Sequence, residues 1–473
     1  MGASGTYDLV VVGAGISGLT LAYRVITARP SARVLVLEAS PRLGGNLRTE
    51  RTPEGYLIDA GPDSWVAQKP QASALAHELG LGTELIGTRS DTRNVYVSHQ
   101  GKLHPMPEGL VLGIPTAAAP IVRTPLFSWA GKMRMALELF VPPRRSVEDE
   151  TVENFLTRRL GAEVCERLAG PLLGGIFSGE PNELSMQTCF PSLLESEATY
   201  GSLILAMRAR KAEALVRAGG ASPPSAFTTL RGGVGALIEG LRVKLHADGV
   251  ELRLQTQVQA LTFQEGSTGA MRLTVGDGQR VQAAQVAFAG PSHVPERLLG
   301  SAAQHADFSL FRYASAATVF LAYDEAQLGR ALNGLGFVVP KSENRAVTAC
   351  TWVSSKWAGR APSGKALVRL FFGGPMGQHW LERPDSDLVE AATREFAHYV
   401  GVQGLPELVR VNRFVRGTPG APFGHLDRVR ALRAQLARMA PGMHVLGNGY
   451  DGTGIPDCIR QAGTVAEQVC EKL

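Results

Sequence analysis

The first forty residues constrain the fold more than any other part of the chain. Residues 8–12 are a short apolar, β-branched run that ends in Gly13, which is typical of a buried strand. From residue 17 to about 27 apolar residues recur at helical spacing, and a second apolar run, 34–37, ends at Glu38. Strand, helix and strand in this order predict a parallel, right-handed β-α-β unit.

A glycine motif joins the first strand to the helix. At the spacing of Gly13, Gly15 and Gly18, the first glycine makes a tight turn and the second lets backbone approach a pyrophosphate. The third lets the helix pack closely on the sheet, and the helix N-terminus favours an anion. Glu38 is placed to accept hydrogen bonds from ribose hydroxyls. The unit is therefore predicted to bind a dinucleotide.

The composition is that of a globular protein with more than one core. A chain of 473 residues, 44% hydrophobic and 19% charged, is expected to form two or three subdomains. The net charge of +5 is dispersed and gives no reason to expect nucleic acid. The five cysteines and ten histidines lack ligand spacing, so we expect no metal and a reducing compartment. We expect neither a secretory signal nor a membrane-spanning helix.

Beyond the first unit, the pattern changes several times. Two short strands near residue 100 precede a proline-rich apolar region, 105–143. Helices are predicted over 148–167 and, for the most part, over 191–216, and an amphipathic helix over 233–245. Strands then alternate with a helix near 388–400, and a last strand leads through glycines into a C-terminal helix from about residue 456.

Two further glycine-rich stretches indicate which dinucleotide is bound. Residues 42–49 follow Glu38 directly and offer a glycine pair with basic neighbours, and residues 447–455 end a strand and open a helix. Both resemble phosphate and closing motifs of the FAD-dependent amine-oxidase superfamily, and residues 256–258 resemble the strand of its adenine pocket. The resemblance implies FAD.

Two stretches are similar to the protoporphyrinogen oxidase family within that superfamily. Residues 59–65 resemble the loop that this family places beside the flavin, and residues 174–191 resemble its GxFxGxxxxLSxxxxFP signature. The likeness covers essentially the whole chain. The chain departs from the family at Phe414, where tryptophan is frequent, and at 419–423, where a Pro-Gln-aromatic run is frequent.

The resemblance implies an α/β protein with α+β elements. We expect a discontinuous, Rossmann-like FAD-binding domain of the amine-oxidase type, a mixed-sheet substrate-binding domain, and a mostly helical domain that associates with a membrane. The expected segments are 1–91, 226–300 and 416–473 for the first domain, 92–98 and 301–415 for the second, and 99–225 for the third.

The resemblance also implies a set of site residues. One noncovalent FAD per chain is expected, held by Gly13, Ala14, Gly15, Ile16, Ser17, Gly18, Glu38, Ala39, Arg42, Gly44, Gly45, Gly61, Pro62, Asp63, Ser64, Val258, Phe414, Gly447, Asn448, Gly454 and Ile455. The residues expected at the substrate are Arg93, which would pair with a propionate, Phe371, which would stack on the ring, and Gly175, Gly336, Val338 and Gly373. No catalytic acid, base or nucleophile is expected, because the flavin takes the hydride.

The implied activity is oxidation of protoporphyrinogen IX to protoporphyrin IX in haem biosynthesis, a CH-CH oxidation with dioxygen as acceptor and hydrogen peroxide as by-product. Three alternatives stay open: oxidation of coproporphyrinogen III to coproporphyrin III, another amine oxidase or desaturase on this fold, and a flavoprotein that only binds a partner. Region 105–143, with its interspersed cations, predicts peripheral contact with the cytoplasmic side of a membrane, although a purely cytoplasmic protein is also compatible. A homodimer is possible.

Overall fold

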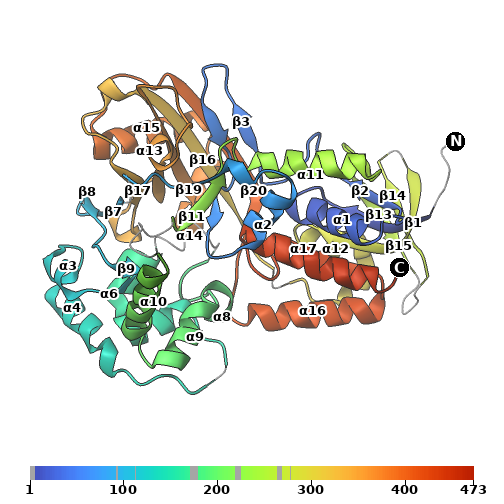
Figure 1. The fold of residues 1–473 in the computed structure, drawn as a ribbon, viewed down its shortest axis with the longest axis horizontal. Coiled ribbons are helices and arrows are strands. Elements are labelled where there is room, and N and C mark those ends of the chain that lie inside the picture. Colours follow the sequence, from blue (N-terminus) through green and yellow to red (C-terminus); the bar gives the residue numbers. More distant parts are fainter. Residues whose placement is uncertain are drawn as a thin grey trace.

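Figure 1 shows a computed structural model of the chain, which combines two large sheets with a helical region. The structure describes residues 6–91, 94–111, 113–146, 148–170, 179–218, 225–263, 269–276, 278–309 and 311–473. Its mixed α/β architecture, with a Rossmann-like sheet, confirms the predicted fold class. No helix in these ranges is both long and apolar enough to cross a membrane.

The first sheet contains the predicted β-α-β unit. Its order is β12 (Glu251–Arg253), β2 (Val34–Leu37), β1 (Thr6–Val12), β15 (Gln279–Ala289), β14 (Met271–Val275) and β13 (Val258–Thr262), and β21 (Met443–Leu446) also pairs with β15. Strands β12, β2, β1, β15 and β21 are parallel, whereas β13, β14 and β15 pair antiparallel.

Helices cover both faces of this sheet. One face carries α1 (Ile16–Ala28), α2 (Gln71–Glu78), α11 (Gly235–Ala247) and α17 (Ile455–Cys470), and the other carries α12 (His293–Leu299) and α16 (His425–Met439). Successive side chains of β1 alternate between the two cores, because strand residues point to opposite faces in turn. Leu9 and Val11 pack under α1, whereas Val10 packs on the α16 side.

The second sheet has the order β20 (Leu408–Pro419), β16 (Tyr313–Asp324), β19 (Lys365–Gly373), β18 (Ala349–Trp352), β17 (Gly334–Val338), β7 (Asn94–His99) and β8 (Lys102–Pro105). All neighbours are antiparallel except β17 and β7. Helix α15 (Asp385–Val400) packs on one face. The other face meets the hairpin of β3 (Thr49–Arg51) and β4 (Leu57–Asp59), which joins the two sheets.

Smaller elements complete the described chain. A small sheet contains β5 (Trp65–Val66), β11 (Phe227–Leu230) and β6 (Leu85–Gly87), and α13 (Val353–Lys356) and α14 (Gly374–Gly377) flank β19. Short 3-10 turns cover Gly82–Glu84, Gly300–His305, Glu325–Gln327, Lys341–Glu343 and Gln378–Glu382.

The helical region has its own apolar core and lies below the second sheet in Figure 1. It comprises β9 (Leu110–Val111), β10 (Ile114–Pro115), α3 (Ala118–Arg123), α4 (Trp129–Ala136), the 3-10 turn Leu137–Phe140, α5 (Val152–Leu160), α6 (Ala162–Val164), the π-helical turn Cys165–Ala169, α8 (Met186–Cys189), α9 (Pro191–Tyr200) and α10 (Leu203–Ala218). The single helix predicted over 148–167 is wrong, because Gly161 has φ +98° and ends α5.

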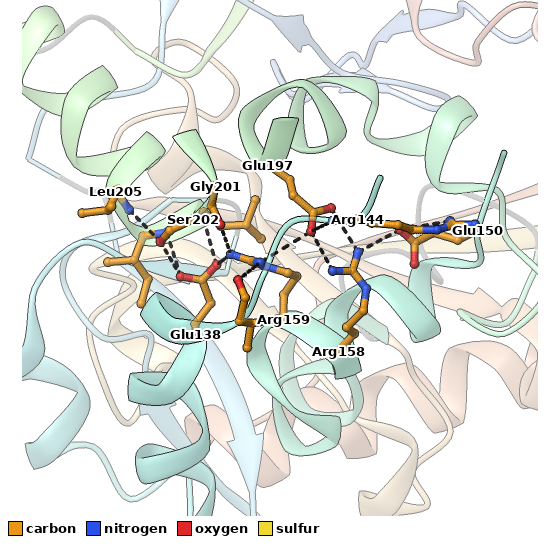
Figure 2. A network of polar contacts seen from close by, with 12 residues as sticks. Glu138, Arg144, Glu150, Arg158, Arg159, Glu197, Gly201, Ser202 and Leu205 are labelled. Carbon is orange, nitrogen blue, oxygen red and sulfur yellow. Dashed lines mark hydrogen bonds and ion pairs between the residues drawn. The ribbon is translucent and has the colours of Figure 1, made fainter. Parts of the chain in front are cut away.

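A buried ion pair holds the turn after α4 against α5 and the start of α10 (Figure 2). The Glu138 and Arg159 side chains are both fully buried and contact each other. Glu138 accepts hydrogen bonds from the Ser202 hydroxyl at 2.6 Å and the Leu203 amide at 2.8 Å. Arg159 also donates to the Gly201 carbonyl at 3.0 Å. Each charge is therefore matched by several partners, as a buried charge requires.

Arg158, on the same helix, extends these contacts toward α9 (Figure 2). Its guanidinium donates to Glu197 at 2.6 Å and to Glu150 at 3.0 Å, and Arg144 lies 3.4 Å from Glu150. Burial raises the pKa of Glu197, but the Arg158 hydrogen bonds and charge outweigh it, so this pKa lies below its usual range. The carboxylate is therefore ionised at neutral pH.

Glu138→Ala is expected to loosen the helical region, because it leaves the Arg159 guanidinium buried and unpaired. Breaking such a pair costs roughly 3–5 kcal/mol. Hydrogen exchange should accelerate in α5 and α10, while exchange in β1 and β15 stays unchanged. Glu195→Ala, at an exposed position of α9, is the matched control. Equal exchange in both variants would show that the pair does not stabilise this region.

Candidate functional site

The turn between β1 and α1 leaves open space at one glycine only. A Cβ atom at Gly13 would lie 2.8 Å from the Ala289 carbonyl oxygen, and one at Gly18 would lie 2.0 Å from the Gly13 carbonyl oxygen. A Cβ at Gly15, by contrast, would meet nothing within 4 Å. The first and third glycines are thus required by packing, and the second faces free space at the N-terminus of α1. That space suits a pyrophosphate.

Glu38 holds this turn in shape. Its carboxylate accepts hydrogen bonds from the Ala14 amide at 2.8 Å and from the Ser40 amide at 2.9 Å. Ala39, which lies between Glu38 and Ser40 in the chain, is exposed. A carboxylate has further acceptor positions, so Glu38 can still bind ribose hydroxyls. Sequence reasoning predicted the ribose role but missed these two bonds.

The second glycine pair contacts the first turn through backbone. The Gly44 amide donates to the Ala14 carbonyl at 2.8 Å, and a Cβ atom at Gly45 would lie 3.3 Å from the Gly15 Cα. Arg42 donates to the Gly45 carbonyl at 2.7 Å. Burial and the nearby Arg48 charge lower the pKa of Arg42. A cation and two glycine turns therefore meet at the N-terminus of α1.

The closing motif, residues 447–455, is linked to the two glycine turns through one carbonyl group. The Gly417 oxygen of β20 accepts hydrogen bonds from the side-chain amides of Asn46 and Asn448, each at 3.3 Å. Gly454 precedes α17, and Ile455, its first residue, is buried. Residues distant in sequence thus lie together around one space.

The loop from 59 to 64 connects this cluster to the second sheet. A Cβ atom at Gly61 would overlap the Asn46 carbonyl oxygen at 1.9 Å. Asp63 accepts hydrogen bonds from Lys356 at 2.9 Å, the Trp357 indole at 3.0 Å and Ser64 at 2.7 Å. Burial raises the pKa of Asp63, but the Lys356 charge and these hydrogen bonds outweigh it and hold this pKa well below its usual range.

Sequence reasoning missed Arg369, which fixes this loop. Its guanidinium is buried, donates to the carbonyls of Gly61 at 2.6 Å and Ala60 at 2.8 Å, and lies 4.5 Å from the Phe371 ring centroid. Burial lowers the pKa of Arg369 to about 10, opposed by the Asp63 charge. The sequence signal that could have revealed this role is a cation inside the otherwise apolar run of β19.

A second buried pair lies under the same loop. Arg360 lies 3.1 Å from the Asp59 carboxylate, which also accepts a hydrogen bond from the Val234 amide at 3.1 Å. Burial raises the pKa of Asp59 and lowers that of Arg360. Several charged groups therefore hold the loop from 59 to 64 in place.

The structure places four of the predicted substrate residues in the second sheet. Phe371 is half-buried, and Val338 packs against the core of the helical region. Gly336 has φ +135°, and a Cβ there would lie 2.0 Å from the Cys350 carbonyl, so strand pairing alone requires this glycine. Gly373 has φ +122°, and a Cβ there would lie 3.1 Å from the Ser315 carbonyl oxygen, a tighter contact than most side chains make.

The remaining predicted residues are spread around the site or outside it. Arg93 and Gly175 lie outside the described residues. Phe414 contacts the Gly61 position, and Pro62 is exposed beside it. Val258 is buried in β13. The other predicted cofactor residues, Ile16, Ser17 and Gly447, lie in α1 and after β21.

The arrangement fits an elongated dinucleotide cofactor. The uncapped N-terminus of α1 has no acidic residue in its first turn, so its amides are available to an anion. Aromatic rings at Phe371 and Phe414 lie farther along, on the second sheet. No group of histidine, cysteine and acidic residues in the described ranges has the geometry of a metal site.

Gly18→Ala is expected to destabilise the protein by roughly 1–3 kcal/mol or more, because the new methyl group overlaps backbone that cannot yield. Gly463→Ala is the matched control, since a Cβ there meets nothing within 4 Å in α17. It should stabilise by roughly 0.5–1 kcal/mol through helix propensity. Thermal unfolding of both variants measures the contrast, and equal shifts would contradict the packing role of Gly18.

Comparison with known proteins agrees with this geometry. The family model for flavin containing amine oxidoreductases matches residues 16–470. Coproporphyrinogen III oxidase of Bacillus subtilis (strain 168) is 32% identical, with 97% of each chain covered. Human protoporphyrinogen oxidase is 30% identical, with 98% of each chain covered.

Solved structures show the same relationship. The crystal structure of a candidate protoporphyrinogen oxidase from Exiguobacterium sp. 255-15 has a TM-score of 0.87 and 32% identity, with 100% of both chains covered. Reduced UDP-galactopyranose mutase shares the fold at a TM-score of 0.70 and 15% identity, over 99% of this chain and 94% of that chain. The chain therefore belongs to the flavin-containing amine oxidoreductases, and within them to the porphyrinogen oxidase family.

Proposed function

We propose that the chain oxidises coproporphyrinogen III to coproporphyrin III, with dioxygen as acceptor and hydrogen peroxide as by-product. The observation that carries this proposal is whole-chain similarity to proteins named coproporphyrinogen III oxidase, at 32% identity in Bacillus subtilis and in Staphylococcus aureus. Relatives named protoporphyrinogen oxidase are similar at 30%. The comparisons thus support the alternative substrate better than protoporphyrinogen IX, which the sequence favoured.

The cofactor in this proposal is one noncovalent FAD per chain. The amides at the start of α1 and the glycines of the first two turns would hold its pyrophosphate, and Glu38 its ribose. When bound, the flavin accepts a hydride. A covalent link is not expected at Cys458, because burial raises the pKa of this thiol to about 11 and keeps it protonated.

The chain's own residues orient the substrate and exclude water. Phe371 would stack on the tetrapyrrole, and Gly336, Val338 and Gly373 would line the space beside it. Gly175 and Arg93 keep their predicted roles as proposals, the first as a position without a side chain and the second as a partner for a propionate. No side chain has to act as acid, base or nucleophile.

The proposed reaction consists of three two-electron oxidations. Each step breaks one C–H bond at a carbon that links two pyrroles, transfers the hydride, and releases a proton from a pyrrole nitrogen or, in one of the three steps, from another linking carbon. Each dioxygen molecule takes up two electrons and two protons and leaves as hydrogen peroxide. Imine–enamine shifts between steps return the next reactive C–H bond to the same position.

The decisive measurement compares both porphyrinogens in parallel. We expect anaerobic coproporphyrinogen III to bleach the flavin absorbance, and porphyrin fluorescence to appear with kcat/KM at least tenfold higher than for protoporphyrinogen IX. Coproporphyrinogen carries four carboxylates and protoporphyrinogen carries two, so carboxylate recognition distinguishes them. A higher kcat/KM for protoporphyrinogen would reverse the substrate assignment. Flavin-replete protein that oxidises neither would favour a binding protein.

We further propose that α4 and the turn after it rest on an anionic lipid surface. Trp129, Met133, Leu137 and Phe140 form an exposed apolar stripe, with exposed fractions of 68%, 63%, 52% and 80%. The Lys132 ammonium lies 4.6 Å from the Trp129 ring centroid and adds a cation at the edge. Apolar side chains with flanking cations are typical of interfacial helices. A homodimer stays a prediction.

A double variant tests the apolar stripe. Trp129→Ser with Phe140→Ser should lower binding to phosphatidylglycerol vesicles by roughly tenfold or more, because two large side chains no longer enter the interface. Leu405→Ser is the matched control, since Leu405 is 80% exposed but lies in the loop before β20. Cosedimentation measures the bound fraction. Unchanged binding of the double variant, or an equal loss in the control, would contradict the proposal.

A further inference from the structure

Among the buried polar atoms of the second sheet that have no hydrogen-bond partner in the described residues, two lie side by side. They are the Thr318 hydroxyl and the Asn412 amide nitrogen, and Thr318 is 2% exposed. They face each other directly across β16 and β20. Leaving a buried donor unpaired costs free energy, so native proteins seldom keep two side by side without a ligand or water.

The strand register places this pair on the face that meets the cofactor cluster. Thr318 also pairs with Phe371 of β19, so the three side chains form one row on one face. The next row contains Arg369, which donates to the Gly61 carbonyl at 2.6 Å. The row on the other side contains Phe414, whose ring lies 3.8 Å from a Cβ atom built at Gly61. The unpaired groups therefore lie between two rows that both contact the loop from 59 to 64.

The environment indicates what the pair binds. Phe371 and Phe414 offer apolar rings on the same face, and the closing motif approaches through the Gly417 carbonyl. A flat ring with polar atoms on its edge would satisfy the aromatic surface and the two unpaired groups together. A propionate is a poorer match, because a hydroxyl and a neutral amide carry no compensating positive charge.

We infer that Thr318 and Asn412 donate hydrogen bonds, directly or through one ordered water, to the nitrogen and carbonyl acceptors of the flavin ring. This inference rests on the proposed placement of FAD between the glycine turns and the second sheet. Electron density on those acceptors rises when the flavin is reduced, so donors stabilise the reduced form more than the oxidised form. The pair therefore raises the reduction potential of the bound flavin.

The test is the midpoint potential of the flavin-loaded protein. Thr318→Val removes the hydroxyl at constant volume, and Asn412→Leu removes the amide. Each should shift the two-electron equilibrium against the reduced flavin by roughly tenfold, which corresponds to about 30 mV. Thr318→Ser keeps the donor and should restore the original potential. Tyr323→Phe is the control, because it removes a hydroxyl from the opposite face of β16, where the ring stacks on Phe396.

Each outcome decides the inference. A lower potential, or a loss of flavin, in Thr318→Val but not in Thr318→Ser or Tyr323→Phe supports the contact. Unchanged potentials and absorbance spectra in both Thr318→Val and Asn412→Leu, at full flavin occupancy, overturn it even if porphyrinogen oxidation is normal. A shifted potential in a protein that oxidises no porphyrinogen keeps this inference and refutes the proposed function instead. Should Thr318→Val fail to fold, the Asn412→Leu measurement stands alone.

Discussion

The backbone contact between Gly15 and Gly45 is the constraint on which the site depends. A Cβ atom at Gly45 would lie only 3.3 Å from the Gly15 Cα, so the two turns approach this closely because Gly45 has no side chain. This crossing brings Arg42 to the N-terminus of α1. It also positions Asn46, whose side chain reaches the Gly417 carbonyl in β20. The close approach of the two glycine turns is therefore linked to the second sheet through Asn46.

The local part of this arrangement could be predicted from the sequence, because short-range signals determine it. The glycine spacing, the apolar run before it and the acid after the second strand each fix a local geometry. Helix α1, predicted from residue 17 to about 27, extends over Ile16–Ala28. The wrong prediction of one helix over 148–167 also comes from a local signal. The apolar periodicity continues across Gly161, whereas the helical backbone conformation ends there.

The charged network under the loop could not be predicted in this way. A single charge in a sequence is most often at the surface, so Asp59 and Asp63 gave no sign of burial. Their partners, Arg360, Lys356 and Arg369, are about 300 residues away and become neighbours only through the pairing of the second sheet. Strand register across such separations depends on tertiary packing rather than on local propensity. The cation within the apolar β19 run was the one visible signal.

The charge balance of this network has a consequence for the site above it. Arg360 and Lys356 form ion pairs with the carboxylates of Asp59 and Asp63, and Arg369 donates to carbonyl groups of the loop, which leaves one positive charge in excess when all five groups are ionised. The lowered pKa of Arg369, about 10, still keeps it protonated at neutral pH. Burial strengthens its field, because the local dielectric is low. In our proposal, a group that gains negative charge against this loop is therefore stabilised by these cations and, from the sheet face, by Thr318 and Asn412. Both contributions have the same sign, so the proposed site favours the electron-rich state of the cofactor.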